Sequence, residues 1–303
     1  MMCRNASVSI HYTMSISRQN LSIVIVTLKS EKVINQCIES IEGDLPIIVV
    51  ENSTNSDFKK YLEEKYKNVK CILSGENLGM GSANNIGIKL ATTNYVYILN
   101  PDTTLEKNTL NEIFLVSEKL EDFSILSPIC SDKSFPNYGI SNKQYLLEND
   151  LPFKVDYVDG FSMLLNKSKF KNDIFFDENF FMYLENNDLC KKVIDDDGSI
   201  YIIPTAKVNH AGGKTVDQKF HEEIELSRNW HWIWSKFYYN KKNFGFFYAI
   251  KSCGGTYVSS LLKFIFYLIL GNSYKRKINF NRASGFYNAL LGKASWYRPN
   301  IKD

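Results

Sequence analysis

The first hundred residues alternate short, uninterrupted apolar runs with segments in which apolar residues recur every three or four positions. Apolar runs of four to eight residues rich in β-branched side chains predict strands buried on both faces of a parallel sheet. Such runs occupy residues 21–28, 46–50 and 95–99, and a further strand is expected at 69–73, where Lys70 interrupts the apolar residues. The segments between them predict a helix capped by Ser30, a second helix at 55–66, and a loop leading into a helix at 77–91. Strands and helices alternating at this spacing predict an α/β fold with a mostly parallel sheet and flanking helices.

The middle of the chain is less regular, and its elements are predicted one by one. We expect strands at 158–166 and 199–204, an aromatic strand or loop at 175–184, a helix at 185–195, and a glycine-bearing loop at 208–215. No internal repeat is found.

Composition then limits the class of protein. With 303 residues and 44% hydrophobic content, the chain can bury the core of one large domain, alone or with an appendage. Its six cysteines are scattered and form no C-x-x-C pair, which argues against a disulfide framework or a zinc site and for a reducing compartment. The polar segment 1–20 has no apolar core typical of a secretory signal, and we expect it to be flexible.

Charge is distributed unevenly along the chain. Residues 228–303 carry 13 Lys/Arg and one acid, which leaves 23 Lys/Arg against 32 Asp/Glu in residues 1–227. All four tryptophans lie in the basic part. We therefore expect a body at 21–227 and a basic, aromatic, helical C-terminal extension at 228–303, with separate roles.

The extension contains the most apolar run of the chain, residues 256–270, which Lys263 interrupts. This run is shorter than the roughly 20 residues needed to span a bilayer. Two interpretations stay open: an amphipathic helix packed on the body, or a helix lying in a membrane interface. The basic charge, the aromatic residues and the KRK sequence at 275–277 favour contact with an anionic membrane. No nucleic-acid-binding motif accompanies the basic charge, so we expect no nucleic-acid partner.

The fourth predicted strand ends abruptly in Asn100-Pro101-Asp102. Proline, Asn and Asp are turn formers, so a simple turn explains these three residues. An acidic side chain at the carboxyl end of a central strand is also where an open α/β sheet places a ligand or metal. Neither G-x-x-x-x-G-K-[ST] nor G-x-G-x-x-G occurs, which argues against a P-loop kinase and a dinucleotide-dependent dehydrogenase.

Seven short motifs follow one another in a recognisable order. They are IVIVT, VVENS, ENLGMGSANNIG, ILNPDTTL, VDGFSMLL, MYLENNDLC and VNHAGG. In this order the chain resembles a family 2 glycosyltransferase with the GT-A fold, in the bacterial rhamnosyltransferase-like branch. The resemblance runs from about Ser22 to Thr215, and the tail also resembles tails of that branch.

The resemblance implies a divalent cation, Mg²⁺ or Mn²⁺, that neutralises the diphosphate of a nucleotide-sugar donor. It assigns Asp102 as a metal ligand, with Asn100 where the family motif has its first acid, and His210 as a second ligand. Imidazole suits Mn²⁺ better than Mg²⁺. A turn-forming Asp102 and a purely structural His210 are the alternatives.

Further site residues follow from the same resemblance. The expected nucleotide-sugar-binding residues are Thr27, Glu51, Asn52, Asn77, Gly79, Asn84, Asn100 and Asp102. The alternative for the 77–84 loop is a helix start capped by Ser82. Asp159 and Gly160 match a region that lines the acceptor site in relatives.

The catalytic base is expected at the start of the 185–195 helix. Inverting transfer needs a carboxylate that removes the acceptor hydroxyl proton. The family has a Glu-Asp pair there, whereas this chain has Glu185-Asn186, and an amide cannot take the proton. Glu185 is the favoured base, and the alternatives are Asp188, which is spaced i, i+3 on the same helix, or an inactive protein. Acids at a helix start also occur for dipole reasons alone.

The resulting hypothesis is an inverting, metal-dependent glycosyltransferase. Resemblance alone suggests dTDP-L-rhamnose as donor, and it implies a glycan or lipid-linked acceptor and a surface polysaccharide such as O-antigen as product. Together with the basic, aromatic extension, it favours a cytoplasmic location peripheral to the inner face of the cell membrane. The alternatives are a UDP-hexose or UDP-N-acetylhexosamine donor, or a non-catalytic nucleotide-sugar-binding paralogue. A sugar-nucleotide pyrophosphorylase is disfavoured because TLKSEKV lacks the glycine-rich loop it would need after the first strand.

Overall fold

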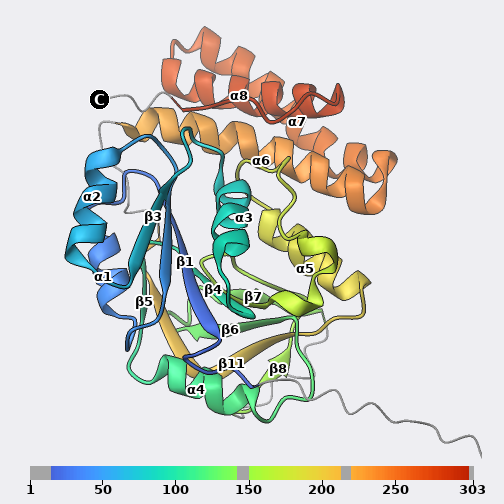
Figure 1. The fold of residues 1–303 in the computed structure, drawn as a ribbon. Coiled ribbons are helices and arrows are strands. Elements are labelled where there is room, and N and C mark those ends of the chain that lie inside the picture. Colours follow the sequence, from blue (N-terminus) through green and yellow to red (C-terminus); the bar gives the residue numbers. More distant parts are fainter. Residues whose placement is uncertain (1–14, 142–149, 213–219, 300–303) are drawn as a thin grey trace, which may run out of the picture.

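The computed structural model describes residues 15–141, 150–212 and 220–299 (Figure 1). Of the segment expected to be flexible, residues 1–14 lie outside this part of the chain. Ile16, in contrast, is 2% exposed, and its backbone N–H donates to Ser117 Oγ at 3.2 Å. Residues 15–20 therefore belong to the packed fold.

A mixed sheet forms the centre of the molecule, in the strand order β3-β2-β1-β4-β10-β6-β11-β5, with β8 paired to β11. The strands are β1 (Leu21–Thr27), β2 (Ile47–Glu51), β3 (Val69–Leu73), β4 (Tyr95–Leu99), β5 (Thr103–Leu105), β6 (Ile125–Cys130), β8 (Phe153–Lys154), β10 (Ser162–Asn166) and β11 (Ile200–His210). β1–β4 pair in parallel as the sequence predicts. β10 lies antiparallel between β4 and β6, which the apolar pattern alone does not reveal. A small second sheet pairs β7 (Tyr138–Gly139) with β9 (Tyr157–Val158).

Two helical layers cover the sheet. α1 (Ile34–Glu39), α2 (Ser56–Lys65) and α4 (Thr109–Ser117) contribute to the apolar core on one face. α3 (Met80–Leu90) and α5 (Glu185–Asp195) contribute to the core on the other face (Figure 1). Each aliphatic side chain buried in these cores stabilises the fold by about 1.5–3 kcal/mol relative to exposure. The expected α/β fold is therefore confirmed.

Several local expectations are corrected. α1 begins at Ile34 rather than directly after Ser30, whose backbone carbonyl accepts from the N–H of Val33 and of Ile34. α3 has Gly79 at its N-cap, so Ser82 lies inside the helix. β11 continues to His210, through the start of the expected loop, because its end pairs with β5. Residues 175–184 form a loop, and α4 and β6 have no counterpart among the predicted elements.

The C-terminal region consists of α6 (His221–Phe244), α7 (Phe246–Ile269) and α8 (Ser273–Leu290), which pack around a cluster of aromatic and small residues. A Cβ on Gly285 of α8 would lie 2.3 Å from the Trp230 carbonyl oxygen, so glycine permits this close helix contact. The expected boundary after residue 227 falls inside α6, which runs along the α/β body (Figure 1). α7 is also longer than the apolar run at 256–270 suggested.

Candidate active site

A cavity of about 410 Å³ lies where β1 and β4 end. Parallel strands end at a common edge, which is where open α/β sheets bind ligands. Of the residues expected to bind a nucleotide sugar, Thr27, Asn52, Asn77, Gly79, Asn100 and Asp102 line this cavity, together with His210. The sequence motifs after separate strands therefore converge on one site.

Asp102 and His210 meet in this cavity, with Oδ1 of Asp102 3.3 Å from Nε2 of His210. The pairing of β11 with β5 places His210 opposite Thr103, and the Ala211 N–H donates to the Asp102 carbonyl at 3.1 Å. The ring of Phe161 stacks on the imidazole, with centroids 4.1 Å apart. Backbone pairing and stacking thus hold the imidazole beside the carboxylate.

Asp102, His210 and Asn100 fit a divalent cation whose other ligands come from a bound phosphate group and from water. Oδ1 of Asn100 is buried and has no hydrogen-bond partner in the described structure. A carboxylate, an imidazole and a free amide oxygen suit Mn²⁺ or Mg²⁺ while leaving coordination positions for phosphate and water. Within the described residues, no group of three or more His, Cys, Asp and Glu side chains could hold a metal ion by itself.

Asn52 fixes the loop that closes one wall of the cavity. Its side-chain oxygen accepts from the Leu78 N–H at 2.9 Å, and its amide donates to Asn77 Oδ1 at 3.1 Å. Gly79 has φ +83°, and a Cβ there would lie 2.2 Å from the Phe181 carbonyl oxygen. Only glycine tolerates both the backbone conformation and the close approach.

Glu51, like Asn84, is an expected nucleotide-binding residue that does not line the first cavity. It is 2% exposed, and its two carboxylate oxygens accept from the hydroxyls of Thr27 and Ser53. Burial raises its pKa, and the two hydroxyl donors oppose that shift. In this structure Glu51 ties the ends of β1 and β2 together.

A second cavity, of about 540 Å³, adjoins the first. Met80, Asn100, Tyr183 and His210 line both. The expected acceptor residues Asp159 and Gly160 line the second cavity, as do Asn84 and Glu185. Burial raises the pKa of Asp159, and the nearby His210 opposes this. Asn84, expected at the nucleotide, therefore lies on the side of the expected acceptor residues.

Glu185 lines the second cavity and carries an unpaired carboxylate oxygen. The residue keeps some exposure, but Oε2 is buried and has no hydrogen-bond partner in the described structure. Burial raises the pKa of Glu185 from 4.5 to about 7. The two residues before it, Tyr183 and Leu184, have φ of +70° and +66°, a strained conformation of the kind found at functional sites. A carboxyl group with this pKa can accept a proton near neutral pH.

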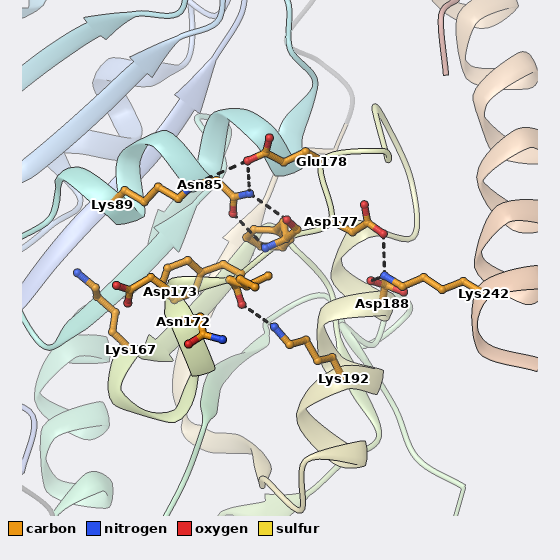
Figure 2. A pocket seen from close by; sticks show the side chains of 13 residues that line it. Asn85, Lys89, Lys167, Asn172, Asp173, Asp177, Glu178, Asp188, Lys192 and Lys242 are labelled. Atoms are coloured by element: carbon orange, nitrogen blue, oxygen red, sulfur yellow. Dashed lines mark hydrogen bonds and ion pairs between the residues drawn. The ribbon is translucent and has the colours of Figure 1, made fainter. Parts of the chain in front are cut away.

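The structure separates Asp188 from Glu185. Asp188 accepts from Lys242 Nζ at 2.7 Å and from the Asn243 amide at 3.2 Å, and it lines a third cavity (Figure 2), which Glu185 does not line. Glu185 and Asp188, which are spaced i, i+3 on α5, therefore line different cavities. Asn186 donates to the Val158 carbonyl at 2.9 Å and so ties α5 to β9.

Residues of the C-terminal region complete both cavities, although the sequence pattern did not predict them. Ser227, Arg228 and Pro299 line the first cavity, and Trp232 lines the second. The Ser227 hydroxyl is buried and has no hydrogen-bond partner in the described structure. The tryptophan-rich sequence indicated a distinct segment, but it could not show that α6 lies against the site.

Comparisons with known proteins agree with this geometry. Residues 22–184 match the family described as Glycosyl transferase family 2. The chain is 30% identical over 188 residues to the low-salt glycan biosynthesis hexosyltransferase Agl10 of Haloferax volcanii, a match covering 56% of this chain and 60% of that protein. It is 26% identical over 212 residues to the dTDP-rhamnosyl transferase RfbF of Shigella flexneri, covering 65% and 71% of the two chains. The rhamnosyltransferase WbbL of Escherichia coli is 26% identical over 217 residues, covering 62% and 82%.

Solved structures share the fold at low identity. The mannosyltransferase PcManGT of Pyrobaculum calidifontis, in complex with GDP-Man and Mn²⁺, gives a TM-score of 0.53 at 12% identity and covers 90% of this chain and 88% of its own. S. aureus TarS 1–349 with UDP-GlcNAc gives 0.52 at 15% identity, covering 94% and 95%. These similarities extend over the C-terminal helices and establish the fold class.

Proposed function

Because the chain belongs to glycosyl transferase family 2, we propose that it is an inverting, divalent-metal-dependent transferase with Glu185 as its base. It is a glycosyltransferase with rhamnosyltransferase-like relatives. One observation carries the proposal: Glu185, whose buried Oε2 has no hydrogen-bond partner in the described structure, lines a cavity that adjoins the Asp102–His210 pair. This arrangement provides a proton acceptor beside a site suited to a diphosphate.

In the proposed reaction, the acceptor hydroxyl gives its proton to Glu185 as its oxygen forms a bond to the anomeric carbon. The bond from that carbon to the diphosphate breaks, and its electron pair leaves with the phosphate oxygen. A pKa of about 7 suits Glu185 to this role. Asn186 is an amide, and Asp188 is engaged in an ion pair, so neither competes as the base.

Asp102 and His210, with Asn100 beside them, would hold Mn²⁺ or Mg²⁺. When bound, the cation would neutralise the charge of the leaving diphosphate. The remaining donor contacts are assigned to residues of the first cavity, with the Asn77–Gly79 loop over the nucleotide and Thr27 and Asn52 beside it. Asp159, Gly160 and Asn84 are assigned to the acceptor side.

The proposed donor is dTDP-L-rhamnose, supported by the names of two relatives, and the proposed acceptor is a glycan or lipid-linked sugar of a surface polysaccharide. The test is a panel of dTDP-L-rhamnose, UDP-glucose, UDP-N-acetylglucosamine and GDP-mannose with Mn²⁺, scored by thermal shift and by nucleoside diphosphate release. A donor at 100 times its Kd stabilises the fold by about 2.7 kcal/mol. We expect the largest shift from dTDP-L-rhamnose.

The other results of this panel are equally decisive. A preference for a UDP sugar supports the alternative donor class, which the relative named a hexosyltransferase also suggests. Binding without any release over long incubation supports a non-catalytic paralogue, an idea that rests on Asn100 and Asn186 standing where acids are usual. The absence of any shift across the panel contradicts a nucleotide-sugar site.

The C-terminal extension is proposed to hold the enzyme at the inner face of the cell membrane, and we place its start at α6. Among the described residues one helix, α7, is long and apolar enough to cross a membrane by length and composition alone, and 11% of its most apolar window is buried. One side of α7 packs on α6 and α8 through Ala249 and Cys253. Its outer side exposes large apolar residues, among them Phe247, Leu262, Ile265 and Ile269, next to the exposed Lys251 and Lys263. A packed inner side and an apolar, basic outer side favour a helix lying in the interface.

We expect the full chain to co-sediment with vesicles containing about 30% anionic lipid at low salt. Ile265→Asp with Ile269→Asp should abolish this binding, because both side chains are more than half exposed on α7. Leu115→Asp, on the equally exposed face of α4, is the matched control and should still sediment. If wild-type protein stays in the supernatant at low salt, the membrane proposal is contradicted. If analytical ultracentrifugation then shows a dimer, the apolar face of α7 binds a second copy of the chain instead.

A further inference from the structure

The third cavity, of about 760 Å³, lies between α3, the loop before α5, α5 itself and α6. Figure 2 shows Lys242 reaching from α6 to the carboxylates of Asp177 and Asp188. None of these three residues lines either cavity of the candidate active site. Their arrangement nevertheless affects α5, the helix that carries Glu185, because Asp188 belongs to the first turn of α5.

Lys242 makes two short charged contacts. Its Nζ lies 2.7 Å from Asp177 Oδ2 and 2.7 Å from Asp188 Oδ2. Neighbouring residues of α6 complete the contacts: Tyr238 donates to Asp177 at 3.0 Å and Asn243 donates to Asp188 at 3.2 Å. Burial alone would lower the pKa of Lys242, yet the two carboxylates raise that pKa overall. Lys242 is therefore charged at neutral pH and forms charge-assisted hydrogen bonds.

Asp188 connects the Lys242 contact to the turn that carries Glu185, the proposed base. Asp188 is 5% exposed, and its backbone N–H donates to the Leu184 carbonyl at 2.9 Å, which closes the turn that carries Glu185. Asn186 holds the same turn from the other side through the Val158 carbonyl. The turn follows two residues in left-handed conformation, so its placement depends on outside contacts rather than on an N-cap side chain.

We propose that Lys242 is a positioning residue that holds the first turn of α5 so that Glu185 keeps its place in the lining of the second cavity, where the expected acceptor residues lie. The inference rests on the proposed function in naming Glu185 as the base. Without Lys242, the buried Asp188 carboxylate would lose its charged partner, and the turn would shift to bring it water. A displacement of about 1 Å at the base can cost as much as a hundredfold in rate.

The test compares Lys242→Met and Lys242→Arg with wild-type protein. Hydrogen exchange of the amides at 184–190 should be about tenfold faster in Lys242→Met and near wild-type in Lys242→Arg. With dTDP-L-rhamnose and Mn²⁺, kcat for nucleoside diphosphate release should fall by about tenfold or more in Lys242→Met, with the donor KM nearly unchanged. Lys277→Met is the matched control, because it breaks the more exposed 2.7 Å pair with Glu222 in the same helical region and should change neither quantity.

Unchanged exchange in Lys242→Met overturns the proposal, and so does faster exchange with unchanged kcat. If wild-type protein releases no nucleoside diphosphate from any donor, the proposed function fails, and the exchange comparison alone decides whether Lys242 holds this turn. If Lys242→Met does not fold, Asp188→Asn replaces it, since the amide oxygen still accepts from Lys242 without the ion pair. That variant should give a smaller change in the same direction, and wild-type exchange with wild-type kcat in it overturns the proposal.

Discussion

Glu185→Gln is expected to lower the rate of glycosyl transfer by about 10²- to 10⁴-fold, the contribution of a general base. The amide has nearly the shape of the carboxylate, so donor affinity and fold should be preserved while the proton acceptor is lost. The measurement is nucleoside diphosphate release in the presence of acceptor, or donor hydrolysis in its absence. Glu178→Gln is the matched control and should retain the wild-type rate, because Glu178 lies on the loop before α5 and does not line the second cavity.

A larger loss in Asp188→Asn than in Glu185→Gln would reverse the assignment of the base. The contacts argue against that result, because Asp188 is engaged by Lys242 and Asn243. A modest loss in Asp188→Asn agrees with its positioning contact to Lys242.

The same substitution should also change stability with a defined sign. Glu185 has a folded-state pKa of about 7 against an ordinary 4.5, so between these values the folded chain holds a proton that the unfolded chain releases. Wild-type stability therefore falls as pH rises through this window, by at most about 3 kcal/mol from this group. Glu185→Gln has no titrating group at this position and does not lose this stability. Its unfolding midpoint should therefore lie at a higher urea concentration than that of wild type at pH 8, with little difference at pH 4. Equal urea midpoints at pH 8 contradict the buried, unpaired carboxylate.

The activity of wild-type enzyme should rise with pH through about 7 as Glu185 loses its proton. The other titratable side chains that line its cavity are Tyr157, Asp159, Tyr183 and His210. Comparing pH–rate profiles of wild type and Asp159→Asn checks that the rising limb belongs to Glu185, since that limb should persist in the variant.

Asp102→Ala should be the second most damaging change, with a loss of about 10²- to 10³-fold in metal-dependent transfer. Among the described residues that line the first cavity, Asp102 is the only carboxylate, so its loss leaves the His210 imidazole without a charged metal ligand beside it. Mn²⁺ binding in the presence of dTDP, followed by electron paramagnetic resonance, should weaken in parallel. Asp57→Ala, an exposed carboxylate at the start of α2, is the control and should bind Mn²⁺ as wild type does. Full Mn²⁺-dependent rate in Asp102→Ala would falsify the metal assignment.

The elements with a strong local pattern are those that the sequence determined. β1, β2 and β4 are short apolar runs, β3 lies at 69–73 as expected although Lys70 interrupts its run, and α2 and α5 lie at or near the residues expected for them. The motif at Asn100–Asp102 was located by the same logic, because a strand that stops at Pro and Asp must present those side chains at the edge of the sheet. Local pattern suffices there, since strands of a parallel sheet that are buried on both faces are mostly apolar along their length.

The tertiary structure decided what depends on partners distant in the chain. Glu185 and Asp188 are three residues apart on one helix, and only α6, which brings Lys242 from 54 residues later, engages Asp188 and leaves Glu185 unpaired. Ser227 and Arg228 likewise line the first cavity only because α6 packs along the body. Helical periodicity states which residues share a face, whereas the contacts of that face depend on the packing of the whole chain.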